Sequence, residues 1–258
     1  MIGAIIGDIV GSRFEFDNHR STDFDFFHPG CCFSDDTVMT VAVADAIMSG
    51  RPFGETMHIY GNAFPDRGYG GRFFRWLHAK EYRPYNSFGN GSAMRVSPCA
   101  FLARGNREQA LTWAAASAVC THNHPEGIKG ALAITDCILM AAERQPKDEI
   151  RKVANALYGY DMDFTIDEIR PYYKFNETCQ QTVPQAIECF LESHDFESAI
   201  RIAISLGGDS DTLANITGGI AEAYYGVPEE MVFKAKSMLP VEMCEVIDKM
   251  YGENPLDF

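Results

Sequence analysis

The segment "GIKGALAITDCILMAAERQP", from Gly127 to Pro146, decides the fold class of this chain. Apolar residues fill most of its positions, and alanine, the strongest helix former, recurs along it. The run ends at Pro146, because proline cannot continue a helix. A helix that is apolar nearly all round is buried among other helices. The segment therefore predicts a helix over 125–143 near the centre of a multilayer bundle.

The rest of the chain shows the same helical periodicity, and alternating strand patterns are hard to find. In "REQALTWAAASAVC", residues 107–120, Ala, Leu and Trp recur at spacings of three and four residues. The predicted architecture is one all-α domain over 1–258, a compact orthogonal bundle of many helices. The longest irregular stretch, 158–179, is expected to be a loop over a pocket. Further helices are predicted over 36–49, 53–64, 70–79, 92–104, 107–120, 147–158, 178–193, 195–205, 211–225, 229–237 and 241–251.

Composition limits the partners and the location of the protein. The 258 residues carry 22 basic and 36 acidic side chains, so the formal charge is 22 − 36 = −14. Such a surface repels a nucleic-acid backbone, and any phosphate-bearing ligand needs a local device such as backbone amides or a metal. No apolar stretch reaches the length of a membrane span, the start lacks a basic signal region, and the eight cysteines show no CxxC spacing. A cytoplasmic monomer with reduced thiols, binding neither membrane nor nucleic acid, is expected.

Two acidic clusters each precede an apolar helical run. The first is "SDDT", residues 34–37, and the second is "GGDSDT", residues 207–212. Carboxylates at helix starts are satisfactory caps, so two independent caps explain the pattern. If the helix starts meet in space, however, at least four carboxylates repel each other unless cations neutralise them. Carboxylate and hydroxyl oxygens are the ligands that Mg²⁺ and Mn²⁺ prefer. Sequence separation alone does not decide between these alternatives.

Three further motifs combine glycine, histidine and acidic residues. "SFGNGSAMRVSP", residues 87–98, puts a glycine-rich turn before a helix, where amides can bind phosphate. "THNHPEG", residues 121–127, offers His122 and His124 either as phosphate or ribose donors or as helix caps. "GAIIGDIVGSRFEF", residues 3–16, has glycine at every fourth position, which lets another backbone approach closely. Asp8 is expected in a buried hydrogen-bond network, and Glu15 in the loop that follows.

Taken in order along nearly the whole chain, these motifs resemble one family, the ADP-ribosylglycohydrolases related to the dinitrogenase reductase-activating enzyme. The resemblance rests on "GDIVGSRFE", "FSDDTVMT", "GNGSAMR", "THNHPEGIKGA" and "GGDSDTLANITGGIAEAYYG". It implies an all-α fold whose cleft holds two divalent cations, Mg²⁺ or Mn²⁺, and hydrolyses the bond between ADP-ribose and a protein side chain. By this resemblance the cation ligands are Ser34, Asp35, Asp36, Asp209, Asp211 and Thr212.

The resemblance also implies roles for residues around the cations. Gly89, Asn90, Gly91 and Ser92 cradle the pyrophosphate, and His122 contacts a phosphate. Glu15 matches the acid on the family's mobile loop, and Asp66 loosely matches an acid proposed as a base in arginine-specific relatives. Tyr69 and Tyr225 are candidates for the adenine or ribose side. The proton acceptor is Asp35, Asp36 or Glu15.

The substrate suggested by the resemblance is a protein carrying ADP-ribosylarginine, because the chain is short and its SDDT and DSDT motifs are plain. ADP-ribosylserine or O-acetyl-ADP-ribose is the alternative within the family. Outside this activity, the chain is either a different two-metal nucleotide hydrolase or a non-catalytic protein that binds ADP-ribose. Retention of all six ligand residues argues against the last, since a structural protein has no need of a carboxylate cluster.

Overall fold

The computed structural model describes residues 1–252, so residues 253–258 of the expected domain lie outside the described part of the chain. The apolar segment that begins at Gly127 forms most of the central helix α8, Pro125–Ala142. Pro125 occupies the first helical position, where its missing N–H is not needed. The helix ends before Arg144, which adopts a left-handed φ of 57°. Ile134 and Ile138 are fully buried, which confirms the predicted interior helix.

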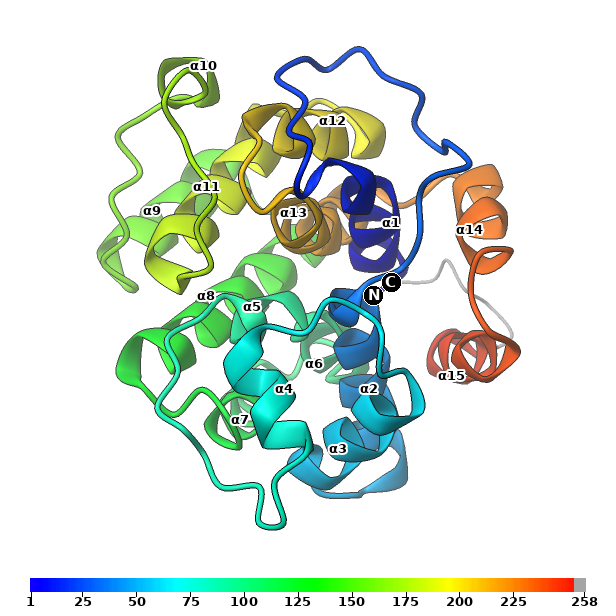
Figure 1. Cartoon of the computed structure of the whole chain (residues 1–258). Coiled ribbons are helices and arrows are strands. Elements are labelled where there is room, and N and C mark those ends of the chain that lie inside the picture. The colour runs from blue at the N-terminus through cyan, green and yellow to red at the C-terminus, as the bar shows by residue number, and fades with distance from the viewer. Residues whose placement is uncertain (253–258) are drawn as a thin grey trace.

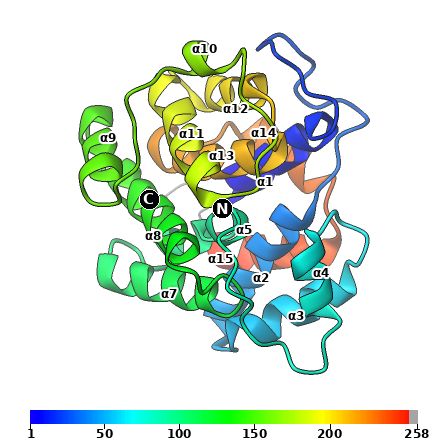
Figure 2. The same ribbon diagram turned by 60° about the vertical axis from the view of Figure 1, so that its left-hand side comes forward.

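A second central pair is formed by α1, Ile2–Gly11, and α13, Ser210–Tyr225. Figures 1 and 2 show these two helices side by side, although they come from opposite ends of the chain. A side chain added at Gly7 would lie 2.0 Å from the carbonyl oxygen of Ala214, and one at Gly3 would lie 2.4 Å from that of Gly218. The glycine spacing therefore allows the two backbones to touch.

Helices surround these central elements, and the predicted all-α class is confirmed for residues 1–252, which contain no β-strand beyond one isolated bridge between Gly89 and Thr178. The expected helix 92–104 is broken into α5 and α6, because Pro98 has no N–H to bond the carbonyl of Met94. The other helices are α2 (Asp35–Ser49), α3 (Phe53–Ala63), α4 (Gly71–Leu77), α5 (Gly91–Met94), α6 (Ser97–Leu102), α7 (Arg107–Val119), α9 (Lys147–Ala156), α10 (Ile166–Ile169), α11 (Cys179–Glu192), α12 (Phe196–Leu206), α14 (Glu229–Lys236), α15 (Val241–Tyr251) and the short 3-10 helix η1 (Ser12–Phe14).

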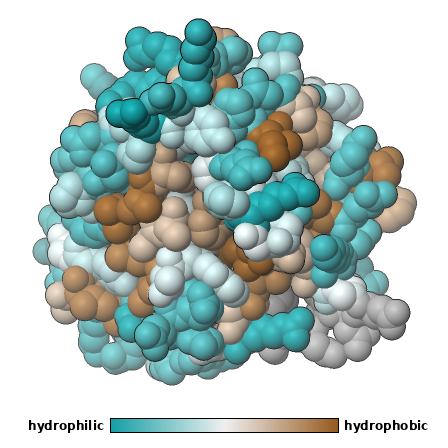
Figure 3. All heavy atoms as spheres, turned by 90° about the horizontal axis from the view of Figure 1, so that it is seen from below, coloured by the Kyte–Doolittle hydropathy of each residue, from teal (hydrophilic) through white to brown (hydrophobic). Residues whose placement is uncertain are grey.

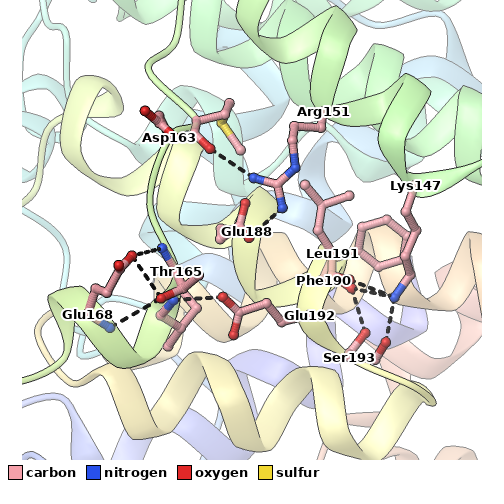
Figure 4. A network of polar contacts seen from close by, with 12 residues as sticks. Lys147, Arg151, Asp163, Thr165, Glu168, Glu188, Phe190, Leu191, Glu192 and Ser193 are labelled. Carbon is pink, nitrogen blue, oxygen red and sulfur yellow. Dashed lines mark hydrogen bonds and ion pairs between the residues drawn. The ribbon is translucent and has the colours of Figure 1, made fainter.

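The segment 158–178 is largely irregular, as predicted, apart from the single turn α10. Figure 4 shows how it is attached to α9 and α11. Arg151 donates to the carbonyl of Met162 at 2.8 Å and forms an ion pair with the buried Glu188 at 2.6 Å. The amide of Ile166 donates to Glu192 at 2.7 Å. These contacts hold the first half of the segment, so that its second half runs on toward Gly89.

The surface is mixed in character. On the face seen in Figure 3, apolar residues form separate patches between polar ones. Among the described residues, none of the helices combines the length and the apolar character needed to cross a membrane.

Candidate active site

The two acidic clusters meet at the starts of α2 and α13. The hydroxyl of Thr212 donates to Asp36 Oδ2 at 3.1 Å, which joins positions 176 residues apart. Ser34 is a true cap of α2, since its Oγ accepts from the amide of Asp36 at 3.2 Å. Asp209 precedes α13 but accepts no capping hydrogen bond there. Capping therefore explains the position of Ser34 but not the carboxylates of Asp36 and Asp209.

Asp8 connects α1 to the start of α2 and so brings the first cluster into place. Its carboxylate accepts from the amide and hydroxyl of Ser34, at 2.9 and 2.6 Å, and from the amide of Thr37 at 3.0 Å. The hydroxyl of Thr37 donates to it as well. One turn further on, at the last residue of α1, a side chain at Gly11 would lie 2.6 Å from Cα of Asp211. The expected buried network around Asp8 is confirmed, and α1 holds both clusters together.

The carboxylates form two groups that share one member. Oxygens of Asp8, Asp36 and Asp211 lie within 4.8 Å of one another, and so do oxygens of Glu15, Asp209 and Asp211. Asp36 Oδ1 is buried and has no hydrogen-bond partner among the described residues. A buried carboxylate oxygen without a donor is costly unless a cation binds it. The donor set, which consists of carboxylates and hydroxyls, suits a hard divalent ion.

Burial and mutual repulsion make these acids reluctant to ionise. Burial first, and then the charges of Asp211 and Asp8, raise the pKa of Asp36 well above its usual range. The pKa of Asp211 is raised in the same way, with Asp209 as its main charged neighbour. Burial raises the pKa of Asp209 to about 6 despite hydrogen bonds that lower it, and burial with nearby carboxylates raises that of Glu15 to about 8. A bound cation removes this penalty by stabilising the ionised form.

A cavity of about 330 Å³ opens above the acids. Its acidic lining residues are Glu15, Asp35 and Asp36 from the first part of the chain, Asp209 just before α13, and Asp211 in the first turn of α13, which also contributes Thr212. Ser34 does not line it. Glu177 and Phe175, from the irregular segment, line it as well. Three arginines also line the cavity, Arg72, Arg75 and Arg95, and the charges of Arg95 and Arg72 act on His122. The cavity is therefore lined by both acidic and basic side chains.

The glycine turn and His122 lie beside both sets of charged residues. Gly89, Asn90 and Gly91 line the cavity, and a side chain at Gly91 would lie 3.2 Å from Nε2 of His122. Asn90 Nδ2 donates to Asp209 at 2.7 Å, which links the turn to the second acidic cluster. Ser92 does not line the cavity, because its buried hydroxyl donates to the carbonyl of Gly127 at 2.8 Å.

His122 is buried and neutral. Burial, followed by the charges of Arg95 and Arg72, lowers its pKa well below the usual value. Arg95 donates to Thr121 Oγ1 at 2.7 Å, and that hydroxyl lies 2.7 Å from His122 Nδ1. Because Oγ1 of Thr121 already accepts from Arg95, its single hydrogen is left to donate to Nδ1 of His122. We therefore assign the proton of the imidazole to Nε2. This N–H faces the glycine turn and is available to an oxyanion.

Several residues named from the sequence lie away from the cavity. Asp66 is exposed and does not line it. The Tyr69 hydroxyl donates to the carbonyl of Phe64 at 2.8 Å, and Tyr225 lies at the far end of α13, where it donates to Ser193. His124 caps α8, since its Nδ1 accepts from the amide of Glu126 at 3.1 Å.

Other lining residues were not found by sequence reasoning. Arg72 follows "RGYGG" and resembles an ordinary surface arginine, and Glu177 lies in the irregular segment. The only available signal was the prediction that this segment covers a pocket.

These features define an all-α protein whose cavity is lined by a cluster of carboxylates together with arginines and a histidine. The family model described as ADP-ribosylglycohydrolase matches residues 1–254, so the chain belongs to that family of hydrolases acting on glycosyl bonds. A solved structure titled "ADP-ribosylglycohydrolase-related protein complex" shares the fold, with a TM-score of 0.70, 22% identity, and coverage of 92% of this chain and 95% of that one.

Curated relatives point to the same general reaction. The chain is 27% identical to human "ADP-ribosylhydrolase ARH3", over 89% of this chain and 85% of the relative. It is 26% identical to "ADP-ribosylarginine hydrolase Tri1" of Pseudomonas putida, over 91% of this chain and 72% of that protein. It is also 28% identical to "ADP-ribosyl-[dinitrogen reductase] glycohydrolase" of Rhodospirillum rubrum, over 66% and 58% respectively.

Proposed function

We propose that this protein is a divalent-cation-dependent hydrolase that releases ADP-ribose from modified arginine side chains. The observation that carries the proposal is the convergence of the two acidic clusters into two carboxylate groups that share Asp211. The proposed ligands are Ser34, Asp35, Asp36, Asp209, Asp211 and Thr212. When bound there, Mg²⁺ or Mn²⁺ polarises oxygens of the substrate and water and stabilises developing charge.

The charge distribution of the cavity orients the substrate. The pyrophosphate of ADP-ribose is dianionic, so it is attracted to Arg72 and to the Nε2–H of His122 and repelled by the acids. The ribose attached to the leaving group then extends over the carboxylates. Gly89 and Gly91 leave room for the phosphates beside His122, because a side chain at either position would approach the imidazole.

Glu15 is our candidate for the proton acceptor. It lines the cavity beside Asp209 and Asp211, and its pKa is raised to about 8 when no cation is bound. A general base works best when its pKa is near the working pH. A bound cation stabilises the ionised form of Glu15 and so lowers this pKa.

An arginine leaving group suits the acidic residues that line the cavity. Glu15 and Glu177 both border it, and their charges interact, since Glu177 contributes to the raised pKa of Glu15. A cationic guanidinium is stabilised by such acids and by the faces of aromatic rings, and Phe175 lies next to Glu177 on this border. The hydroxyl of a serine leaving group gains none of the charge interaction. One relative, 26% identical, is itself named an ADP-ribosylarginine hydrolase.

The test is release of ADP-ribose from peptides modified on arginine or on serine, and from O-acetyl-ADP-ribose, with Mg²⁺, with Mn²⁺ and with EDTA. We expect cation-dependent release from the arginine peptide. The double variant Asp36→Asn/Asp211→Asn should lose this activity. The matched control, Asp148→Asn/Asp161→Asn, changes two exposed acids away from the cavity and should keep it.

Other products identify the alternatives. Release from serine alone overturns the arginine assignment, while metal-dependent release of AMP or inorganic phosphate indicates a two-metal nucleotide hydrolase. Tight binding of ADP-ribose without release from any substrate indicates a non-catalytic binder.

A further inference from the structure

The side chain of Asn18 joins the segment that carries Glu15 to the turn that leads into Asp209. Its Nδ2 donates to the carbonyls of Phe14 at 2.8 Å, Glu15 at 3.1 Å and Gly208 at 2.9 Å. Its Oδ1 accepts from the amide of Gly208 at 2.8 Å. The side chain of Asn18 thus binds both the N–H and the carbonyl of Gly208. This pairing fixes the orientation of the peptide between Gly208 and Asp209.

The turn is built to receive this side chain. Gly207 and Gly208 have φ values of 73° and 76°, in the left-handed region that glycine adopts without strain. A side chain at Gly207 would lie 3.1 Å from Asn18 Oδ1 and 2.9 Å from Cζ of Arg20. The backbone of the turn therefore packs directly against the segment 18–20.

Arg20 extends the same attachment. It donates to the carbonyl of Arg170 at 2.6 Å and to that of Tyr173 at 2.7 Å. It also donates to the carbonyl of Leu206, the last residue of α12. The Glu15 segment, the glycine turn and the irregular segment are thereby held as one unit.

The two carboxylate groups differ in how they are held. Asp8 binds Ser34 and Thr37 and so supports the group of Asp8, Asp36 and Asp211. Asn18 has no contact with that group among its hydrogen bonds. Instead, it binds the backbone of Glu15 and that of Gly208, the residue before Asp209. Glu15 and Asp209 both belong to the second group.

We propose that Asn18 is a positioning residue for the second carboxylate group and sets the affinity of one of the two cation positions. The inference rests on the two-cation function proposed above. Residues that orient metal ligands through hydrogen bonds typically change the affinity about 10- to 100-fold when they are removed. The side chain of Asn18 hydrogen-bonds to backbone atoms of Phe14, Glu15 and Gly208, so its removal acts through the placement of the Glu15 and Asp209 carboxylates.

The experiment is a calorimetric titration of the cation-free protein with Mn²⁺ alone, on the wild type, Asn18→Ala, Asn18→Gln and the control Asn62→Ala. Asn62 also donates from its side chain to a carbonyl, that of His58, but lies on α3. We expect two Mn²⁺ ions in the wild type and in the control. Asn18→Ala should keep one ion at wild-type affinity and bind the other about 10- to 100-fold more weakly. Asn18→Gln, which retains the amide, should fall between them.

Activity and stability complete the test. In Asn18→Ala, kcat for the ADP-ribosylarginine peptide should fall at limiting Mn²⁺ and recover at saturating Mn²⁺, with Tm within about 2 °C of the control. Two ions bound at wild-type affinities, or equal weakening of both, overturn the role of Asn18. A wild type that does not bind two Mn²⁺ ions overturns the proposed two-cation function instead, so the two failures are distinguishable.

Discussion

Replacement of Gly7 by alanine should separate α1 from α13 and damage both stability and the site. A side chain at this position would lie 2.0 Å from the carbonyl oxygen of Ala214, whereas an ordinary contact begins at 3.4 Å. The backbones must therefore move apart by about 1.4 Å, the difference between these two distances. The obstacle is backbone, so no rotamer change relieves it.

The expected magnitude follows from two opposing terms. Overpacking of a rigid core costs about 1–3 kcal/mol, and this contact belongs at the upper end. Alanine in place of glycine gains up to about 1 kcal/mol of helix propensity. The net loss in the free energy of unfolding is therefore about 2–3 kcal/mol. Gly54→Ala in α3 is the matched control, because its tightest contact would be 3.4 Å from Cys120 Cβ. The control should be neutral or stabilised by up to about 1 kcal/mol.

Urea unfolding of both variants, followed by circular dichroism, measures this difference. Gly7 precedes Asp8 and lies one helical turn before Gly11, which packs against Asp211, so Mn²⁺ affinity should fall in Gly7→Ala and stay unchanged in Gly54→Ala. If Gly7→Ala proves as stable as Gly54→Ala and binds Mn²⁺ equally well, the close α1–α13 packing does not hold the acids in place.

The remaining predictions concern charge. In the folded, cation-free protein the pKa of Glu15 is raised to about 8 and that of Asp209 to about 6. The folded state therefore binds protons more tightly than the unfolded chain, and its stability should fall as pH rises from about 4.5 to 8. Thermal melts in EDTA should show a declining Tm over this range, and excess Mg²⁺ should abolish the decline. Arg72→Gln should raise KM for the arginine peptide about tenfold with kcat nearly unchanged, while the exposed control Arg83→Gln should not; an unchanged KM would remove Arg72 from phosphate binding. Glu177→Gln should lower kcat/KM for the arginine peptide and leave any activity on the serine peptide unchanged, and an equal loss on both would contradict a role in recognising the leaving group.

Much of the helical architecture was predictable because its causes are local. The boundaries of α8 follow from apolar periodicity, from Pro125 at its start and from Pro146, which ends the run. The break between α5 and α6 also had a local signal, Pro98, which the periodicity of the surrounding residues hid. The glycine repeat in α1 predicted a close backbone neighbour without identifying it, because a pattern in one helix says nothing about which helix packs against it.

By itself, the sequence determined which residues form helices and which chemistry the site offers, since periodicity, proline and motif composition are properties of short segments. Only the tertiary structure decided that Thr212 meets Asp36 across 176 residues, and that Asp66, on the loop next to Asp35, points to solvent away from the cavity. It also showed that Asn18, an unremarkable polar residue in the sequence, binds the turn before Asp209. These placements depend on how distant backbones pack, and the contacts of Gly7 and Gly11 with α13 bring the acids together.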